Sequence, residues 1–134
     1  MARGVEMRVL WIDDDRLYIR PIIEDIRDLG HTVDQIYHVD DGFTKAITEG
    51  GNYERIVLDI MLPARGDFNV PAARNGFRTG MVLLERLISE IPGVAARLVV
   101  VSVVRDQEPQ SMTSAHGVRY IFKSRVRAED IVGG

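Results

Sequence analysis

Short apolar runs alternate along the chain with segments in which apolar residues recur every three or four positions. Ile19, Ile22, Ile23 and Ile26 show this second pattern, which is one face of an amphipathic helix. Runs that are apolar throughout are typical of strands buried on both faces, and helices between them indicate parallel crossovers. The pattern therefore predicts an α/β fold, a doubly wound five-stranded parallel sheet. The expected strands are residues 9–12, 33–39, 56–58, 98–101 and 120–122.

Local signals predict how several elements are bounded. Gly30 stands where a left-handed C-terminal cap of the first helix is expected, and Asp40 or Asp41 is expected to cap the second helix. The second strand mixes polar with apolar residues, which favours an edge of the sheet. Residues 64–80 make a strand-to-helix connection about a dozen residues longer than usual. Two interpretations of it stay open, a mobile surface insertion and a lid or docking element.

Composition narrows the class of protein. At 134 residues the chain fits one domain, with residues 1–7 expected as a tail and 8–134 as the folded domain. A net charge of −3 argues against direct nucleic-acid and membrane-surface binding, because both need a basic surface. The absence of cysteine excludes disulfides, thiol catalysis and Cys-ligated zinc. With no apolar run of roughly 20 residues, we expect no membrane span and a cytoplasmic location.

Four of the five predicted strands end at a polar group. Asp13 and Asp14 follow the first strand, Asp59 the third, Ser102 the fourth and Lys123 the fifth. In open parallel sheets, ligands bind beyond the carboxyl ends of the strands. We therefore expect these side chains to form one site.

Three neighbouring carboxylates repel one another, so such a site favours raised pKa values or a bound cation. Mg²⁺ is the natural cation, since it takes hard oxygen ligands from one or two carboxylates. An aspartate can act as a covalent nucleophile toward a phosphoryl donor. The Lys123 ammonium would offset the phosphoryl charge, and Ser102 would hydrogen-bond its oxygens.

Four segments resemble the signature segments of two-component response-regulator receiver domains, the CheY-like superfamily. They are VLWIDDD at 9–15, IVLDIMLP at 56–63, VVVS at 99–102 and YIFK at 120–123. The resemblance covers roughly residues 8–125 and implies a flavodoxin-like sheet of strand order 2-1-3-4-5. It implies that Asp59 is the phosphoacceptor. Asp14, Asp59 and the backbone carbonyl of Met61 would hold Mg²⁺, with Asp13 acting largely through water.

The same resemblance implies a signalling switch rather than an enzyme. Ser102 and Tyr120 would be the switch pair, in which the hydroxyl moves toward the phosphoryl group and the ring turns inward, and Lys123 would be the family's lysine. The implied partners are a sensor histidine kinase or phosphotransfer protein, and a downstream protein or an output region removed from this chain.

Three features depart from the family's pattern. Val103 replaces the usual small residue after the switch hydroxyl and is expected to crowd the phosphoryl site, and Ser124 replaces the proline after the lysine. The chain holds only residues 128–132 of the expected fifth helix, so this helix is truncated or missing. Apolar surface near the first and last strands should then be poorly covered, and a second copy in a homodimer, a partner or a removed segment is expected to cover it.

Two alternative functions stay open. A pseudo-receiver would keep the fold as an interaction module without phosphorylation, which Val103 and the short last helix favour. A phosphatase of the haloacid-dehalogenase type would use Asp13 as nucleophile and Asp15 as acid, but the acidic pair expected after the fourth strand is absent, and Ser102 and Val103 stand there.

Overall fold

The computed structural model describes residues 6–133 and shows alternating strands and helices. The strands are β1 (Arg8–Ile12), β2 (Thr32–Ile36), β3 (Arg55–Leu58), β4 (Leu98–Ser102) and β5 (Arg119–Phe122). The helices are α1 (Arg16–Asp28), α2 (Val39–Glu49), α3 (Thr79–Glu90), α4 (Gln107–Ala115) and α5 (Ala128–Val132). Short 3-10 helices are η1 (Gly50–Asn52), η2 (Gly66–Phe68), η3 (Pro71–Gly76) and η4 (Val94–Arg97).

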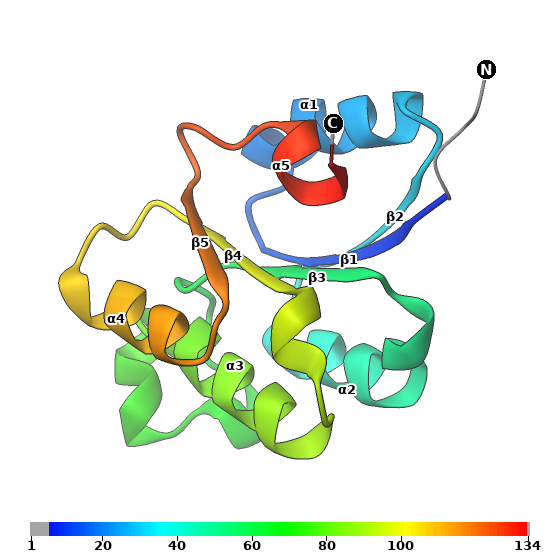
Figure 1. The fold of residues 1–134 in the computed structure, drawn as a ribbon. Coiled ribbons are helices and arrows are strands. Elements are labelled where there is room, and N and C mark those ends of the chain that lie inside the picture. Colours follow the sequence, from blue (N-terminus) through cyan, green and yellow to red (C-terminus); the bar gives the residue numbers. More distant parts are fainter. Residues whose placement is uncertain (1–5, 134) are drawn as a thin grey trace.

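The five strands pair in parallel in the order β2-β1-β3-β4-β5. This confirms both the predicted sheet and the edge position of β2. Helices α1 and α5 cover one face of the sheet, and α2, α3 and α4 cover the other (Figure 1). The arrangement brings the carboxyl ends of all five strands to one edge of the sheet, as parallel pairing requires.

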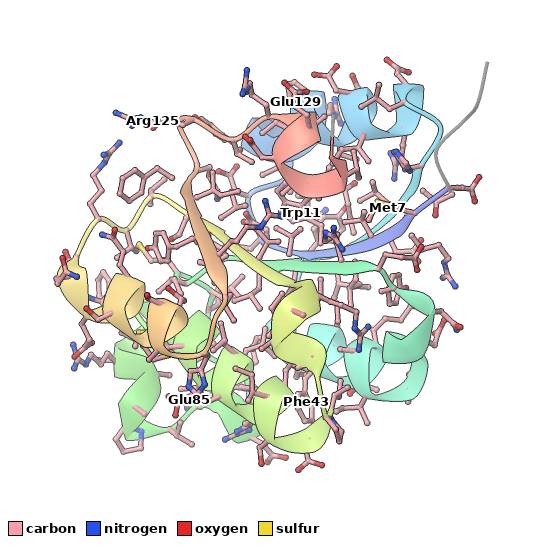
Figure 2. The ribbon with its side chains drawn as sticks, viewed as in Figure 1. Met7, Trp11, Phe43, Glu85, Arg125 and Glu129 are labelled. Carbon is pink, nitrogen blue, oxygen red and sulfur yellow. The ribbon has the colours of Figure 1, made fainter. Side chains whose placement is uncertain are left out.

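Each face of the sheet packs its own apolar core, because neighbouring residues of a strand point to opposite faces. In β1, Leu10 and Ile12 join the core under α2 and α3, whereas Val9 and Trp11 join the core under α1 and α5. All four side chains are fully buried, and Figure 2 shows Trp11 in the layer between β1 and the helices above it. The prediction of poor cover over β1 is therefore wrong, because α5, though only five residues long, closes this core with Ile131.

The second strand is shorter than predicted. It ends at Ile36, whose carbonyl accepts the Asp13 amide at 3.0 Å, and Val39 is the first residue of α2. His38 is the N-cap residue and makes no side-chain cap, so the expected cap by Asp40 or Asp41 is also wrong. Val39 misled the prediction because a fully buried apolar residue at a helix start has the same polarity pattern as the end of a strand.

Residues 64–80 contain η2 and η3 and pack against the domain. Phe68 is 2% exposed and meets Phe43 edge-on, with ring centroids 5.5 Å apart, and Ala73 is fully buried. Gly30 has φ of 96°, as its predicted cap position requires. Among residues 6–133, no helix is long and apolar enough to cross a membrane.

Candidate functional site

The site lies where β1, β3, β4 and β5 end. Lys123 connects it: its Nζ lies 3.0 Å from Asp59 Oδ2 and 2.9 Å from Asp13 Oδ2, and 3.7 Å from Asp15 Oδ2. Lys123 and Asp59 are each 3% exposed and Asp13 is 1% exposed, whereas Asp14 is exposed. The structure thus brings together the acidic residues and the lysine that the sequence singled out. It adds Asp15, which was a candidate only for the phosphatase alternative.

The Asp59 carboxylate is held by both of its oxygens. Oδ1 accepts the backbone amide of Ile60 at 2.7 Å and, more weakly, that of Met61 at 3.4 Å, while Oδ2 faces Lys123. Met61 thus contacts Asp59 through its amide, and the role of its carbonyl as a metal ligand stays a prediction. Two amides and an ammonium fix the orientation of this carboxylate before any ligand binds.

The pKa values of Asp13 and Lys123 are both raised, but for different physical reasons. Burial raises the pKa of Asp13 to about 6, and repulsion from Asp59 adds to this rise. The Lys123 ammonium and the Asp15 amide, which donates to Asp13 Oδ1 at 2.9 Å, only partly oppose it. For Lys123, burial works against the charge, but attraction to Asp59 and Asp13 outweighs burial and raises its pKa above the ordinary value. Lys123 is therefore a cation at neutral pH, whereas the pKa of Asp13 lies well above its ordinary value of 3.8.

The acids can also hold a divalent cation. Asp13, Asp14 and Asp59 each offer a carboxylate oxygen, and these oxygens lie within 4.8 Å of one another. A set of hard oxygen donors around one point fits Mg²⁺ or Ca²⁺ rather than a softer metal. The two buried carboxylates outnumber the single lysine cation, so the residues present fit a cation bound beside Lys123.

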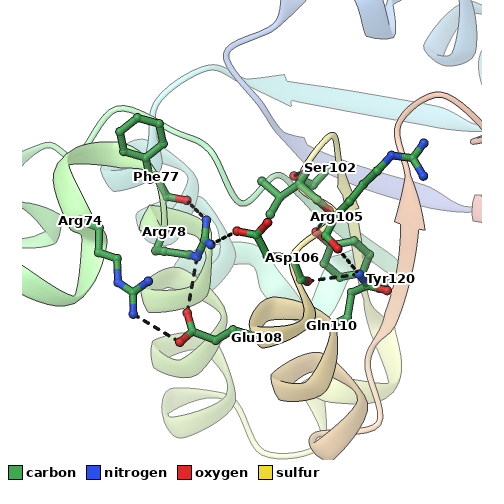
Figure 3. A network of polar contacts seen from close by, with 10 residues as sticks. Arg74, Phe77, Arg78, Ser102, Arg105, Asp106, Glu108, Gln110 and Tyr120 are labelled. Atoms are coloured by element: carbon green, nitrogen blue, oxygen red, sulfur yellow. Dashed lines mark hydrogen bonds and ion pairs between the residues drawn. The ribbon is translucent and has the colours of Figure 1, made fainter.

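The predicted switch residues lie next to this cluster. Ser102 is fully buried, and its Oγ accepts the Val104 amide at 3.2 Å. The Tyr120 hydroxyl donates to the Val104 carbonyl at 2.5 Å, and Figure 3 shows Tyr120 beside the segment that follows Ser102. Burial raises the pKa of Tyr120, and the neighbouring Ser102 hydroxyl partly opposes this rise. The side chain of Val103 is 57% exposed, so it stands open to solvent at the end of β4.

One glycine next to the site was not singled out from the sequence. The amide of Gly80 donates to the Ile60 carbonyl at 2.8 Å, and a Cβ at Gly80 would lie 1.9 Å from the backbone oxygen of Asp59. Only glycine lets the start of α3 approach this closely. The GxxxG spacing of Gly76 and Gly80 does not by itself predict this close contact, because the contact depends on how α3 packs against the end of β3.

The chain is similar in fold to solved receiver domains. The chain aligns over 96% of its length with a CheY-like response regulator receiver domain from Methanospirillum hungatei, at a TM-score of 0.72 and 21% identity, covering 89% of that chain. A CheX–CheY–BeF3–Mg complex from Borrelia burgdorferi gives a TM-score of 0.73 at 17% identity, covering 97% of this chain and 87% of that one. This chain has the receiver-domain fold. The features that define this fold here are the sheet order β2-β1-β3-β4-β5 and the helices on both faces of the sheet.

Curated relatives share part of the sequence. The transcriptional regulatory protein DltR of Streptococcus agalactiae is 36% identical over 64 residues, which are 48% of this chain and 28% of DltR. TcrA of Mycobacterium tuberculosis is 33% identical over 66 residues, 49% of this chain and 25% of TcrA. The matched segment is thus about half of this receiver-fold chain and about a quarter of each regulator. No family model matches the chain.

Proposed function

We propose that this chain is a phosphoacceptor switch of a two-component or phosphorelay system, with Asp59 as the phosphorylated residue. The observation that carries the proposal is the buried Asp59 carboxylate, oriented by two amides and paired with Lys123 at 3.0 Å, at the end of β3 in a receiver fold. A solved response regulator from Burkholderia pseudomallei with the same fold has a phosphorylated aspartic acid and a calcium ion (TM-score 0.70, 20% identity).

In the proposed transfer, an oxygen of Asp59 bonds to phosphorus while the bond from phosphorus to the donor breaks, and the donor leaves with that electron pair. Lys123 stays protonated and offsets the negative charge on the phosphoryl oxygens. Ser102 donates its hydroxyl to a phosphoryl oxygen once it has moved toward Asp59. A carboxylate nucleophile attacks as the anion, so the proposed step requires no residue that removes a proton.

Mg²⁺ is the proposed cofactor. Asp13, Asp14 and Asp59 would hold it, with the Met61 carbonyl as a further ligand. When bound, it supplies positive charge that lets a phosphoryl anion approach the acidic site. The Borrelia complex with the same fold contains BeF3 and Mg²⁺.

The proposed partners follow from the switch. A sensor histidine kinase or phosphotransfer protein would supply the phosphoryl group, and a downstream protein, a second copy or an output region outside this chain would respond to it. We place this exchange in the cytoplasm, and we propose no enzymatic turnover and no direct contact with nucleic acid or membrane.

The decisive experiment measures the intact mass after incubation with Mg²⁺ and acetyl phosphate. Wild type is expected to gain one phosphoryl group, and Asp59→Asn is expected to gain none. Asp14→Asn serves as a control that keeps the acceptor and weakens metal binding, so it should be labelled more slowly than wild type.

Each other outcome selects an alternative. No gain in wild type at any Mg²⁺ concentration favours the pseudo-receiver, an interaction module that is not phosphorylated. A gain that persists in Asp59→Asn but disappears in Asp13→Asn favours the phosphatase-type assignment, in which Asp13 is the nucleophile and Asp15 the acid.

A further inference from the structure

Ion pairs join the long connection of residues 64–80 to the segment that follows β4. The Arg78 guanidinium contacts Asp106, and its Nε lies 3.5 Å from Glu108 Oε1. Arg74 lies 3.3 Å from Glu108 Oε2. Figure 3 shows the two arginines reaching from one side and the two acids from the other, across the space between η3 and the start of α4.

Arg78 is well placed to restrain this segment. Its side chain is 11% exposed, although its partners Asp106 and Glu108 are 64% and 52% exposed. Salt screens the ion pairs of a guanidinium that is shielded from water less than it screens the fully exposed ion pairs of a protein surface. Its own backbone is anchored as well, since the Arg78 amide donates to the Ala73 carbonyl at 2.8 Å. The position of Arg78 is therefore restrained, and its ion pairs restrain Asp106 and Glu108 in turn.

The restrained segment begins at the proposed switch residue. Val104 is held on both sides, because its amide donates to Ser102 Oγ and its carbonyl accepts the Tyr120 hydroxyl. Asp106 follows two residues later, and Gln110 donates to the carbonyls of both Arg105 and Asp106. The hydrogen bonds at Val104 and the ion pair at Asp106 thus lie two residues apart on one stretch of backbone. Through that backbone, a shift of Ser102 toward Asp59 would pull on the ion pairs.

We infer that Arg78 is a positioning residue that holds Ser102, Val104 and Asp106 in their resting place and so opposes movement of the Ser102 hydroxyl toward a phosphoryl group on Asp59. That Arg78 restrains the segment after β4 rests on its contacts alone. That this restraint opposes switching rests on the proposed function of Asp59. Breaking the ion pairs destabilises the resting arrangement alone, and this shifts the population toward the arrangement that binds the phosphoryl group.

The test compares Arg78→Gln, Arg78→Lys and Asp106→Asn with wild type. Arg65→Gln is the matched control, because Arg65 lies in the same connection but pairs with Asp40 of α2, at 3.4 Å. Hydrogen exchange at the Val104 amide is measured without ligand. Affinity for beryllofluoride with Mg²⁺ is then measured through the fluorescence of Trp11, the only tryptophan, at low and at high salt.

In Arg78→Gln and Asp106→Asn we expect faster exchange at Val104 and an affinity for beryllofluoride higher by about threefold at low salt, a size set by one partly shielded ion pair. The double variant that combines Arg78→Gln with Asp106→Asn should add little to either single change. Arg78→Lys keeps the charge and should restore part of the wild-type behaviour, which a loss of packing alone would not allow. High salt should bring wild type closer to Arg78→Gln, and Arg65→Gln should behave as wild type.

Unchanged Val104 exchange in Arg78→Gln would overturn the structural part of the inference, whatever the ligand affinities are. Faster exchange with unchanged affinity would overturn the link to Ser102 and leave the role of Asp59 intact. A failure of every variant, wild type included, to bind beryllofluoride would count against the proposed function itself, and with it against any role of Arg78 in switching.

Discussion

At the scale of single residues, the site is a balance between burial and charge. Asp13 and Asp59 are almost completely buried at the end of the sheet, and one ammonium, Lys123, lies within 3.0 Å of both. One cation cannot fully compensate two buried anions. The balance is left to a proton on Asp13 or, as we propose, to a bound divalent cation.

This balance predicts a pH dependence of stability in protein kept free of divalent ions. The pKa of Asp13 is about 6 in the folded chain, above its ordinary value of 3.8. As the pH rises, the unfolded chain therefore loses this proton before the folded chain does. The free energy of unfolding is expected to fall between about pH 4 and pH 6, and the full loss, about 3 kcal/mol at most, is reached above about pH 6. Urea unfolding of wild type and Asp13→Asn with EDTA should show this decline in wild type only. Parallel pH profiles would contradict it.

At the scale of elements, the start of α3 is built against the strand that carries Asp59. Gly80 lies directly on the backbone of Asp59 and Ile60, and the long connection before it packs Phe68 and Ala73 into the domain. The connection is therefore part of what positions the end of β3. Its two consecutive left-handed residues, Arg74 and Asn75, kink the chain within η3.

Gly80→Ala should disturb this contact. A methyl group 1.9 Å from the Asp59 backbone oxygen cannot be accommodated without moving α3 or the end of β3. We expect a loss of about 1–3 kcal/mol in the free energy of unfolding, the usual cost of overpacking, and weaker binding of beryllofluoride. Gly51→Ala is the control, because nothing lies within 4 Å of a Cβ at that position. Equal stability of the two variants in urea unfolding would refute the close contact.

At the scale of the whole molecule, two cores on opposite faces of one sheet stabilise the domain. The face under α1 is completed by α5, where Ile131 is fully buried and its carbonyl accepts Arg55 Nε at 3.1 Å. This contact ties the last helix to β3, far away in the sequence. A helix of five residues is too short to be stable by itself, so tertiary packing must hold it.

Ile131→Ala should accordingly destabilise the whole domain rather than fray one end. We expect a loss of about 2–4 kcal/mol, since the substitution leaves a cavity in a core that includes Trp11. Ile47→Ala, at a side chain 42% exposed on α2, should cost much less. Chemical unfolding followed by Trp11 fluorescence and by circular dichroism gives both values. A near-neutral effect of Ile131→Ala would show that α5 is dispensable.

The sequence by itself determined that five strands form a parallel sheet, the edge position of β2, the cap at Gly30 and the acids and lysine at the strand ends. These depend on period, polarity and backbone preference, which are local properties of the chain. It did not determine that Val39 begins a helix, that α5 closes a core or that Gly80 touches Asp59. It also did not reveal the pairing of Arg78 with Asp106, 28 residues away. Only the tertiary structure decided these four features, because each depends on which distant segments the fold brings into contact. The order of polar and apolar residues along the chain does not specify such contacts.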